Sequence, residues 1–319
     1  EEKGSPYSRF PSNTNILFAN LQEMEKVVET HPHPGLLVNF RKGHHYHAEE
    51  KQEEIARLET TMQNIADALE VDHKKPLPTY LTFNTRRKTI ATTKRKSSAK
   101  GKMLETPEGS YYSYMCNAKE LLNEHCQMEL PHFPDEKTFI RKGPSFLFSY
   151  HPALGPLYSV IGQKVRGGNL KEGSELQLEI ADLEMENLSL DGSLLIHATD
   201  PMGHLENGIL SYSHKCGRCH LKNVTVKNEG IDWEEDHLFW KHEVKRKGAL
   251  KIVLHGHSEF FAENITITRD LTLEVPHGMR MHAEEKNGRV IFITEPFESS
   301  RPFWNYSINS EKRIVLSRA

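Results

Sequence analysis

A dense run of basic residues is the first feature that could do chemistry. The seventeen residues 86–102 include eight cationic side chains: Arg86, Arg87, Lys88, Lys94, Arg95, Lys96, Lys100 and Lys102. Lysine and arginine bind phosphate oxygens through charge-assisted hydrogen bonds. The same composition is typical of a solvated loop, and the aromatic residues that alternate with basic ones in many nucleic-acid sites are missing. The run predicts a phosphate-binding segment or an exposed loop, and no nucleic-acid partner.

A pair of cysteines has the spacing of a metal site. Cys216 and Cys219 form a C-x-x-C pattern, with His214 and His220 beside them. Two thiolates and two imidazoles can complete a tetrahedral zinc site. The other two of the four cysteines lie in the first half of the chain. Two ordinary thiols are therefore the alternative interpretation.

Other polar clusters and motifs are less specific. Histidines gather between residues 31 and 47, and glutamates pair at 49–50 and 53–54, without the spacing of a metal site. We interpret both as solvated surface. The sequence has no Gly-x-Ser-x-Gly elbow, P-loop, Rossmann glycine fingerprint or His-Glu-x-x-His motif.

Composition indicates a globular protein rather than a nucleic-acid coat or a membrane protein. The 319 residues carry 41 basic against 44 acidic side chains, and no apolar run approaches the length of a membrane span. Few cysteines suit a reducing cytosol, so we expect a cytoplasmic location. The chain does not open with Met, which indicates that it starts inside a longer polypeptide.

The elements that would position these residues differ between the two halves. In the first half, apolar spacing predicts helices over 16–30, 50–69 and 111–122, and short strands over 35–40 and 80–83. Residues 94–109 are expected to form a flexible loop. A Pro- and Gly-rich stretch at 151–156 indicates a linker, which gives domains of 1–150 and 151–319.

The second half contains a repeated strand pattern. Asparagine precedes an apolar–hydroxyl–apolar triplet three times, at 187–190, 223–226 and 264–267. Asparagine suits a corner because it tolerates an unusual φ. Three copies favour the rungs of a β-solenoid, whereas a β-sandwich with similar strands is the alternative. We expect Ser189, Thr225 and Thr266 to point outward and their apolar neighbours inward.

Several segments, in order, resemble the C-terminal half of the UDP-sugar pyrophosphorylases, in the UDP-glucose/UDP-N-acetylhexosamine pyrophosphorylase superfamily. Residues 5–15 (SPYSRFPSNTN) resemble the family's S-P-F-S-x-F-P-G-N-x-N segment, and residues 57–64 (RLETTMQN) resemble R-L-E-C-M-M-Q-D. Val38-Asn39 and Thr93-Lys94-Arg95 fall where the family has F-V-N-P and P-V-K-N. Residues 188–196 (LSLDGSLLI) are close to L-S-L-D-G-A-L-I-V.

The resemblance implies a uridylyltransferase that makes UDP-sugar and pyrophosphate from UTP and a sugar 1-phosphate with Mg²⁺. It implies an α/β Rossmann-like nucleotidyltransferase portion, incomplete without its N-terminal half, followed by a left-handed β-helix-like solenoid. By the same resemblance Lys94 is the catalytic, phosphate-contacting lysine. Arg95 and Lys96 add positive charge beside it, and we expect them to be weaker phosphate contacts. Asn13, Glu59 and Gln63 would bind the sugar.

The sequence also departs from the family's pattern. The Gly-rich nucleotide loop and the uridine- and metal-binding residues of the N-terminal half are absent, so that half is the expected partner and the expected holder of Mg²⁺. Around Lys94, the family's prolines and asparagine are replaced by Thr92, Thr93 and Arg95, and Asn64 replaces an aspartate. The alternatives are a non-catalytic β-solenoid binding or assembly module on a degenerate transferase, and a zinc-dependent interaction module built on Cys216 and Cys219.

Overall fold

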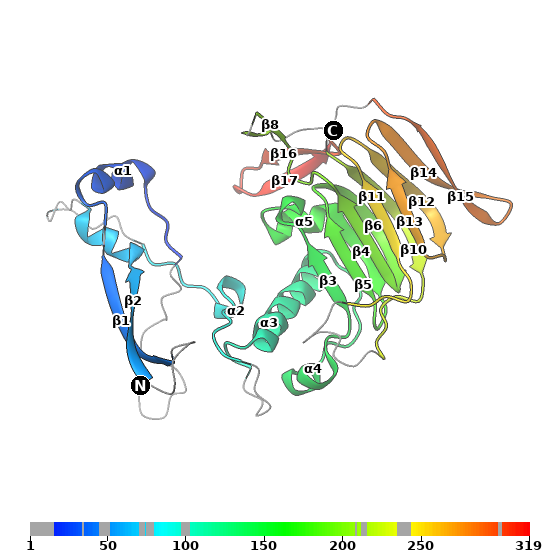
Figure 1. The fold of residues 1–319 in the computed structure, drawn as a ribbon. Coiled ribbons are helices and arrows are strands. Elements are labelled where there is room, and N and C mark those ends of the chain that lie inside the picture. The colour runs from blue at the N-terminus through cyan, green and yellow to red at the C-terminus, as the bar shows by residue number, and fades with distance from the viewer. Residues whose placement is uncertain are drawn as a thin grey trace. The chain divides into compact units, whose positions relative to one another are not determined.

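The computed structural model describes residues 16–33, 35–44, 52–69, 74, 80–96, 103–207, 209–211, 216–234, 244–298 and 302–319. The chain divides into two compact units, Glu1–Ile90 and Ala91–Ala319 (Figure 1). The division therefore falls after Ile90 rather than at the predicted residue 150. Residues 91–150 are grouped with the later strands because β3 (Leu147–Tyr150) pairs with β5 (Glu175–Glu179).

The first unit contains one antiparallel strand pair and short helices. Helix α1 (Leu21–Thr30) begins at Asn20, whose side chain accepts a hydrogen bond from the Gln22 backbone N–H. This helix confirms most of the segment predicted at 16–30. Strand β1 (Leu36–His44) pairs with β2 (Gln52–Thr60), and a 3₁₀ helix (Met62–Ala68) and α2 (Arg86–Thr89) follow.

Two predicted elements of this unit were wrong. The helix expected over 50–69 is strand β2 followed by the 3₁₀ helix, although Ile55, Leu58 and Met62 have helical spacing. Pairing with β1 satisfies the backbone hydrogen-bonding groups of this segment. This tertiary contact outweighs the helical spacing of its apolar residues. The strand expected at 80–83 is irregular in the structure.

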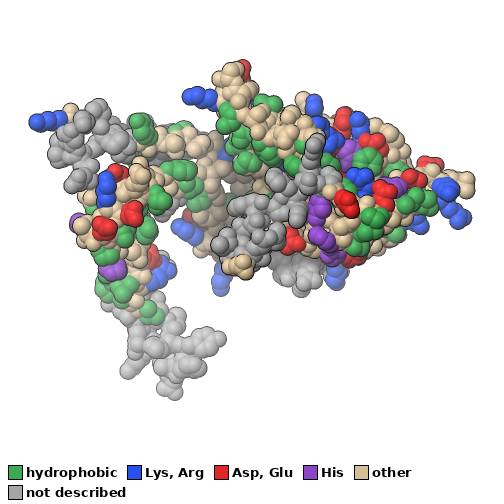
Figure 2. Space-filling view, turned by 90° about the horizontal axis from the view of Figure 1, so that it is seen from above, with side chains coloured by type: hydrophobic (Ala, Val, Ile, Leu, Met, Phe, Trp, Pro, Cys, Tyr) green, Lys and Arg blue, Asp and Glu red, His purple; other side chains and the backbone are tan. Residues whose placement is uncertain are grey.

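Most large apolar side chains of the first unit are exposed. Among its described residues, the buried apolar side chains are Val27 and Ile65. The exposed ones include Ile16, Leu17, Phe18, Leu21, Val28, Leu36, Leu37, Val38, Phe40, Ile55, Leu58, Met62, Tyr80, Leu81 and Phe83. Hydrophobic side chains are visible across this unit, on the left of Figure 2. The described part of the first unit therefore has no apolar core of its own.

The second unit begins with helices that lie at one end of its sheets (Figure 1). Helix α3 (Pro107–Glu120) starts at Thr106, which accepts from the Gly109 N–H, and confirms the helix predicted at 111–122. It continues into a π turn (Leu121–His125). Helix α4 (Glu136–Lys142), a 3₁₀ turn (Pro152–Leu154) and α5 (Tyr158–Lys164) follow.

Two sheets form the body of this unit, and all their strand pairs are parallel except β14–β15, which is antiparallel. The first sheet has the order β15-β14-β12-β10-β6-β4, and the second has the order β13-β11-β7-β5-β3. From β3 to β14 the chain alternates between them, apart from the hairpin β8–β9, and their apolar faces enclose one core. The strands are β3 (Leu147–Tyr150), β4 (Val165–Leu170), β5 (Glu175–Glu179), β6 (Asp182–Asp191), β7 (Ser193–Ala198), β8 (His204–Glu206), β9 (Ile209–Ser211), β10 (Arg218–Lys227), β11 (Leu250–Leu254), β12 (Glu259–Ile267), β13 (Leu271–Val275), β14 (Met279–Lys286), β15 (Arg289–Pro296), β16 (Trp304–Ile308) and β17 (Ile314–Arg318).

The repeated asparagines are corners, as predicted. Asn187, Asn223 and Asn264 have φ of 55°, 52° and 52°, and each bends its strand in the first sheet. Their amides form a ladder: Asn187 Nδ2 donates to Asn223 Oδ1 over 3.1 Å, and Asn223 Nδ2 donates to Asn264 Oδ1 over 2.8 Å. The apolar residue on each side of the following hydroxyl is buried in all three rungs, and Thr225 pairs with both Ser189 and Thr266. The predicted register of these three segments, with their apolar side chains inward, is confirmed.

The hairpin β16–β17 returns across the first sheet to the early rungs. The backbone N–H of Phe303 donates to Asp182 Oδ2 over 2.9 Å, and Trp304 Nε1 donates to the Leu183 carbonyl over 2.8 Å. On α5, the Gln163 side chain bonds the backbone of β17. These bonds place the last strands beside β6.

The parallel sheets agree with the expected fold class in general terms. The Rossmann-like assignment of residues 1–150 stays a prediction, because β1 and β2, the strands described before β3, are antiparallel. None of the described helices is long and apolar enough to cross a membrane.

Candidate functional site

The predicted sugar-binding residues belong to the first unit. Glu59 is on β2 and forms an ion pair with Arg57, and Gln63 is exposed on the 3₁₀ helix. Asn13 lies outside the described residues. The structure therefore describes two of the three residues, and both have polar groups that solvent can reach.

The predicted phosphate-binding residues belong to the second unit. The backbone N–H groups of Lys94 and Arg95 both donate to the Glu105 carbonyl, over 2.8 and 2.9 Å. Arg95 Nε also lies 3.3 Å from Glu105 Oε2. The side chains of Lys94 and Lys96 are exposed. The backbone is thus fixed beside the start of α3, while the ammonium groups stay open to solvent. Glu59 and Gln63 lie in the other unit.

Of the four candidate zinc ligands, the structure describes Cys216, Cys219 and His220, whereas His214 lies outside the described residues. Cys219 is fully buried in the core and Cys216 is partly exposed. Burial raises the pKa of Cys216 to about 11 and also raises the pKa of Cys219, so both are neutral thiols at pH 7. No group of three metal-binding side chains occurs among the described residues. The interpretation as ordinary thiols fits this geometry.

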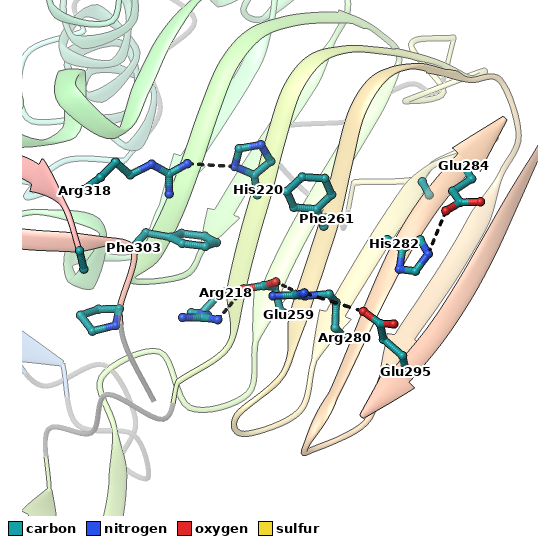
Figure 3. A pocket seen from close by; sticks show the side chains of 13 residues that line it. Arg218, His220, Glu259, Phe261, Arg280, His282, Glu284, Glu295, Phe303 and Arg318 are labelled. Carbon is teal, nitrogen blue, oxygen red and sulfur yellow. Dashed lines mark hydrogen bonds and ion pairs between the residues drawn. The ribbon is translucent and has the colours of Figure 1, made fainter. Parts of the chain in front are cut away.

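A pocket that the sequence did not predict lies on the outer face of the first sheet (Figure 3). Its volume is about 550 Å³. Strands β10, β12, β14 and β15 supply its floor, and the C-terminal hairpin supplies one wall. The lining side chains are those of Arg218, His220, Glu259, Phe261, Arg280, His282, Ala283, Glu284, Glu295, Pro302, Phe303, Arg318 and Ala319.

One row of the floor is a continuous chain of ion pairs. Glu259 lies between two arginines: its Oε2 is 2.6 Å from Arg218 Nη2, and its Oε1 contacts Arg280. Arg280 Nη1 is in turn 3.8 Å from Glu295. The side chains of Arg218 and Glu259 are only 4% and 2% exposed, so each needs the other's charge. Phe297 also packs over Arg218, at 4.5 Å from ring centre to guanidinium.

The next row is built around His220. Its Nδ1 contacts Glu184 and its Nε2 lies 2.8 Å from Glu263 Oε1. The ring stacks on Phe261 with centroids 4.5 Å apart and planes 7° apart. Arg318 contacts Glu184 from the other side and stacks 5.2 Å from Phe303, which closes the wall of the pocket.

The strand register explains how these residues meet. Asp182, Arg218 and Glu259 each lie five positions before a corner asparagine and are direct partners across β6, β10 and β12. Aligning the sequence on its asparagines would have placed these three charges in one row. On the face seen in Figure 2, histidine, acidic and basic side chains gather over this unit. The arrangement can bind a polar ligand through donors and acceptors held on rigid strands.

Comparison with known proteins supports the resemblance seen in the sequence. Residues 165–319 match the family model described as UGP3-like, C-terminal hexapeptide repeats. The resemblance to UDP-sugar pyrophosphorylases is confirmed. A relative from Arabidopsis thaliana, named UTP–glucose-1-phosphate uridylyltransferase 3, chloroplastic, is 36% identical over 328 residues. The match covers 94% of this chain and 37% of the relative, so the chain spans little more than a third of that protein. No solved structure matches.

Proposed function

We propose that this chain is part of a uridylyltransferase that forms a UDP-sugar and pyrophosphate from UTP and a sugar 1-phosphate. The observation that carries the proposal is the 36% identity, over nearly the whole chain, to a relative named for that reaction. The cytoplasmic location stays a prediction, and the relative's name describes a chloroplast protein.

The chemistry requires positioning and positive charge more than a protein nucleophile. A phosphate oxygen of the sugar 1-phosphate attacks the α-phosphorus of UTP, the bond to the β-phosphate breaks, and pyrophosphate leaves. Negative charge on the phosphates is then stabilised by fixed cations. We assign this role to the exposed ammonium of Lys94. Arg95 and Lys96 add to the positive electrostatic potential around the phosphates. Asn13, Glu59 and Gln63 are assigned to the sugar.

Magnesium is part of the proposal, but we assign it no ligand among the residues that the structure describes. The described residues contain no group of three His, Cys, Asp or Glu side chains that could hold a metal. When bound, Mg²⁺ would neutralise phosphate charge. We expect residues of the N-terminal half to hold it.

The exposed apolar surface of the first unit supports a requirement for that N-terminal half. Among the described residues of this unit, fifteen large apolar side chains are exposed, and burying even a few of them gives about 1.5–3 kcal/mol each. The relative is much longer than this chain. We therefore propose that the remaining part of the same polypeptide covers these apolar side chains. We also propose that residues 165–319 form a left-handed β-helix, which the match to hexapeptide repeats favours.

The test is an activity assay of a polypeptide that contains this chain and the expected N-terminal half. UTP, Mg²⁺ and glucose 1-phosphate, galactose 1-phosphate or N-acetylglucosamine 1-phosphate are supplied, and pyrophosphate release is measured. Release that depends on both substrates supports the proposal. A folded, full-length polypeptide that releases none with any of the three sugars would favour the non-catalytic binding or assembly module instead.

A further inference from the structure

The pocket on the first sheet is separate from the residues assigned to uridylyl transfer. It uses side chains from β10, β12, β14, β15 and the C-terminal hairpin, whereas Lys94 precedes α3 and Glu59 is on β2. Its most buried groups, Arg218 and Glu259, are fixed on adjacent strands by a 2.6 Å ion pair. A rigid floor of this kind binds a ligand without first having to become ordered.

The charges of the lining disfavour a charged ligand. Three arginines and three glutamates line the pocket, and each of the glutamates has a cation or an imidazole beside it. Glu184 and Glu263 add two carboxylates around His220. A phosphate would approach these carboxylates, and a cation would approach the guanidinium groups. Either ion would have to break an existing pair.

The hydrogen-bonding capacity favours an uncharged ligand with many hydroxyl groups. A carboxylate accepts several hydrogen bonds and a guanidinium donates five, so an ion pair leaves part of each group's capacity open. The side chains of Glu284 and Glu295 are half-exposed, and Arg280 is partly so. Phe261, between His220 and His282, and Phe303, beside Arg318, add apolar surface to the pocket (Figure 3). Sugar hydroxyls donate and accept at the same atom, and sugar C–H groups pack on apolar surface.

We propose that this pocket is a binding site for a neutral mono- or disaccharide, held against Phe261 by Arg280 and Glu284. The volume of about 550 Å³ is within the usual range for small-molecule sites. None of the residues assigned to the sugar 1-phosphate lines this pocket, and a binding measurement needs no catalysis.

The experiment is titration of the full chain with maltose and with glucose, followed by calorimetry and saturation-transfer NMR. Glu284→Ala removes an acceptor at the pocket, where Glu284 lies 3.2 Å from His282. Glu274→Ala is the matched control, because Glu274, which is on β13 in the other sheet, forms a similarly exposed pair with His255. Thermal unfolding establishes that both variants fold.

We expect one or both sugars to bind the unmodified chain, and Glu284→Ala to weaken binding by about tenfold, as loss of one or two hydrogen bonds would. Glu274→Ala should bind as the unmodified chain does. Equal effects of the two substitutions, binding of inorganic phosphate in place of sugar, or no binding of either sugar by the folded chain would overturn the proposal. Because no UTP is used, a failed activity assay leaves this result unaffected.

Discussion

At the scale of single residues, Lys94 is the side chain on which the proposed reaction depends most. Lys94→Ala in the complete enzyme should lower kcat by about 10²–10³, the usual effect of removing one electrostatic contact to the transition state. Folding should be unchanged, since the side chain is exposed. Steady-state kinetics of pyrophosphate release measures the effect. Arg95→Ala and Lys96→Ala are the controls, and should mainly raise KM in a salt-dependent way. A Lys94→Ala enzyme within threefold of the unmodified one would exclude this lysine from the mechanism.

The ion pair of Glu259, the buried carboxylate of the row, leads to a prediction about the free energy of unfolding. Glu259→Gln removes the carboxylate charge that lies 2.6 Å from the guanidinium of Arg218, a side chain only 4% exposed. Loss of one partner from a buried pair costs about 3–5 kcal/mol of unfolding free energy. Urea unfolding of the chain measures this cost, and Glu274→Gln, at an exposed carboxylate, should cost less than about 1 kcal/mol. Similar costs for both substitutions would contradict the assigned role of the row.

The burial of Lys164 leads to a prediction about how the free energy of unfolding depends on pH. Its ammonium is buried and donates to the carbonyls of Leu154 and Ala181 over 2.6 and 2.7 Å. Desolvation nevertheless lowers the pKa of Lys164 to about 8, from 10.5. Between these two values the unfolded chain binds the proton and the folded chain does not, so stability should rise as the pH increases through this window. From pH 7.5 to 10.5, the unfolding free energy of the unmodified chain minus that of Lys164→Met should rise with pH, because the buried thiols titrate in both proteins and cancel in this difference. An equal slope in both proteins would show that this lysine does not titrate as described.

At the scale of elements, the corner asparagines determine how the rungs stack. Asn223 has a φ of 52°, where an alanine is strained by about 1–2 kcal/mol and a glycine is not. Asn223→Ala and Asn223→Gly both lose the amide ladder to Asn187 and Asn264. We therefore expect Asn223→Ala to be the less stable of the two in urea unfolding, by about 1 kcal/mol. If the glycine variant were the less stable, the φ of this corner would not be the controlling feature.

The same elements show what the sequence can predict. The asparagine pattern gave the rungs and their inward residues because corner geometry is local. The 50–69 segment was interpreted as a helix because Ile55, Leu58 and Met62 have helical spacing, and only the partner strand β1 makes it a strand. The pocket was missed because its charges are adjacent across strands and distant in sequence. Phe303, from the returning hairpin, could not be placed without knowing where the chain folds back.

At the scale of the whole molecule, the two units should differ in whether each can fold by itself. Residues 91–319 enclose an apolar core, whereas the described part of residues 1–90 buries two apolar side chains. We expect residues 91–319 alone to unfold in one cooperative transition. Residues 1–90 alone should show no sharp transition and should bind a dye specific for exposed apolar surface. Calorimetry and dye fluorescence measure both. Cooperative unfolding of monomeric 1–90 would remove the argument for a missing packing partner.

The return of the C-terminal hairpin has a mechanical consequence. A stack of rungs can fray from its ends, because each rung contacts only its neighbours. Here Phe303 and Trp304 are bonded to Asp182 and Leu183, 121 positions earlier in the chain. A pulling force on the C-terminus would therefore act first on the hydrogen bonds between the β16–β17 hairpin and β6, and only afterwards on β15. The final rungs are protected from peeling until a contact near the opposite end of the stack has broken.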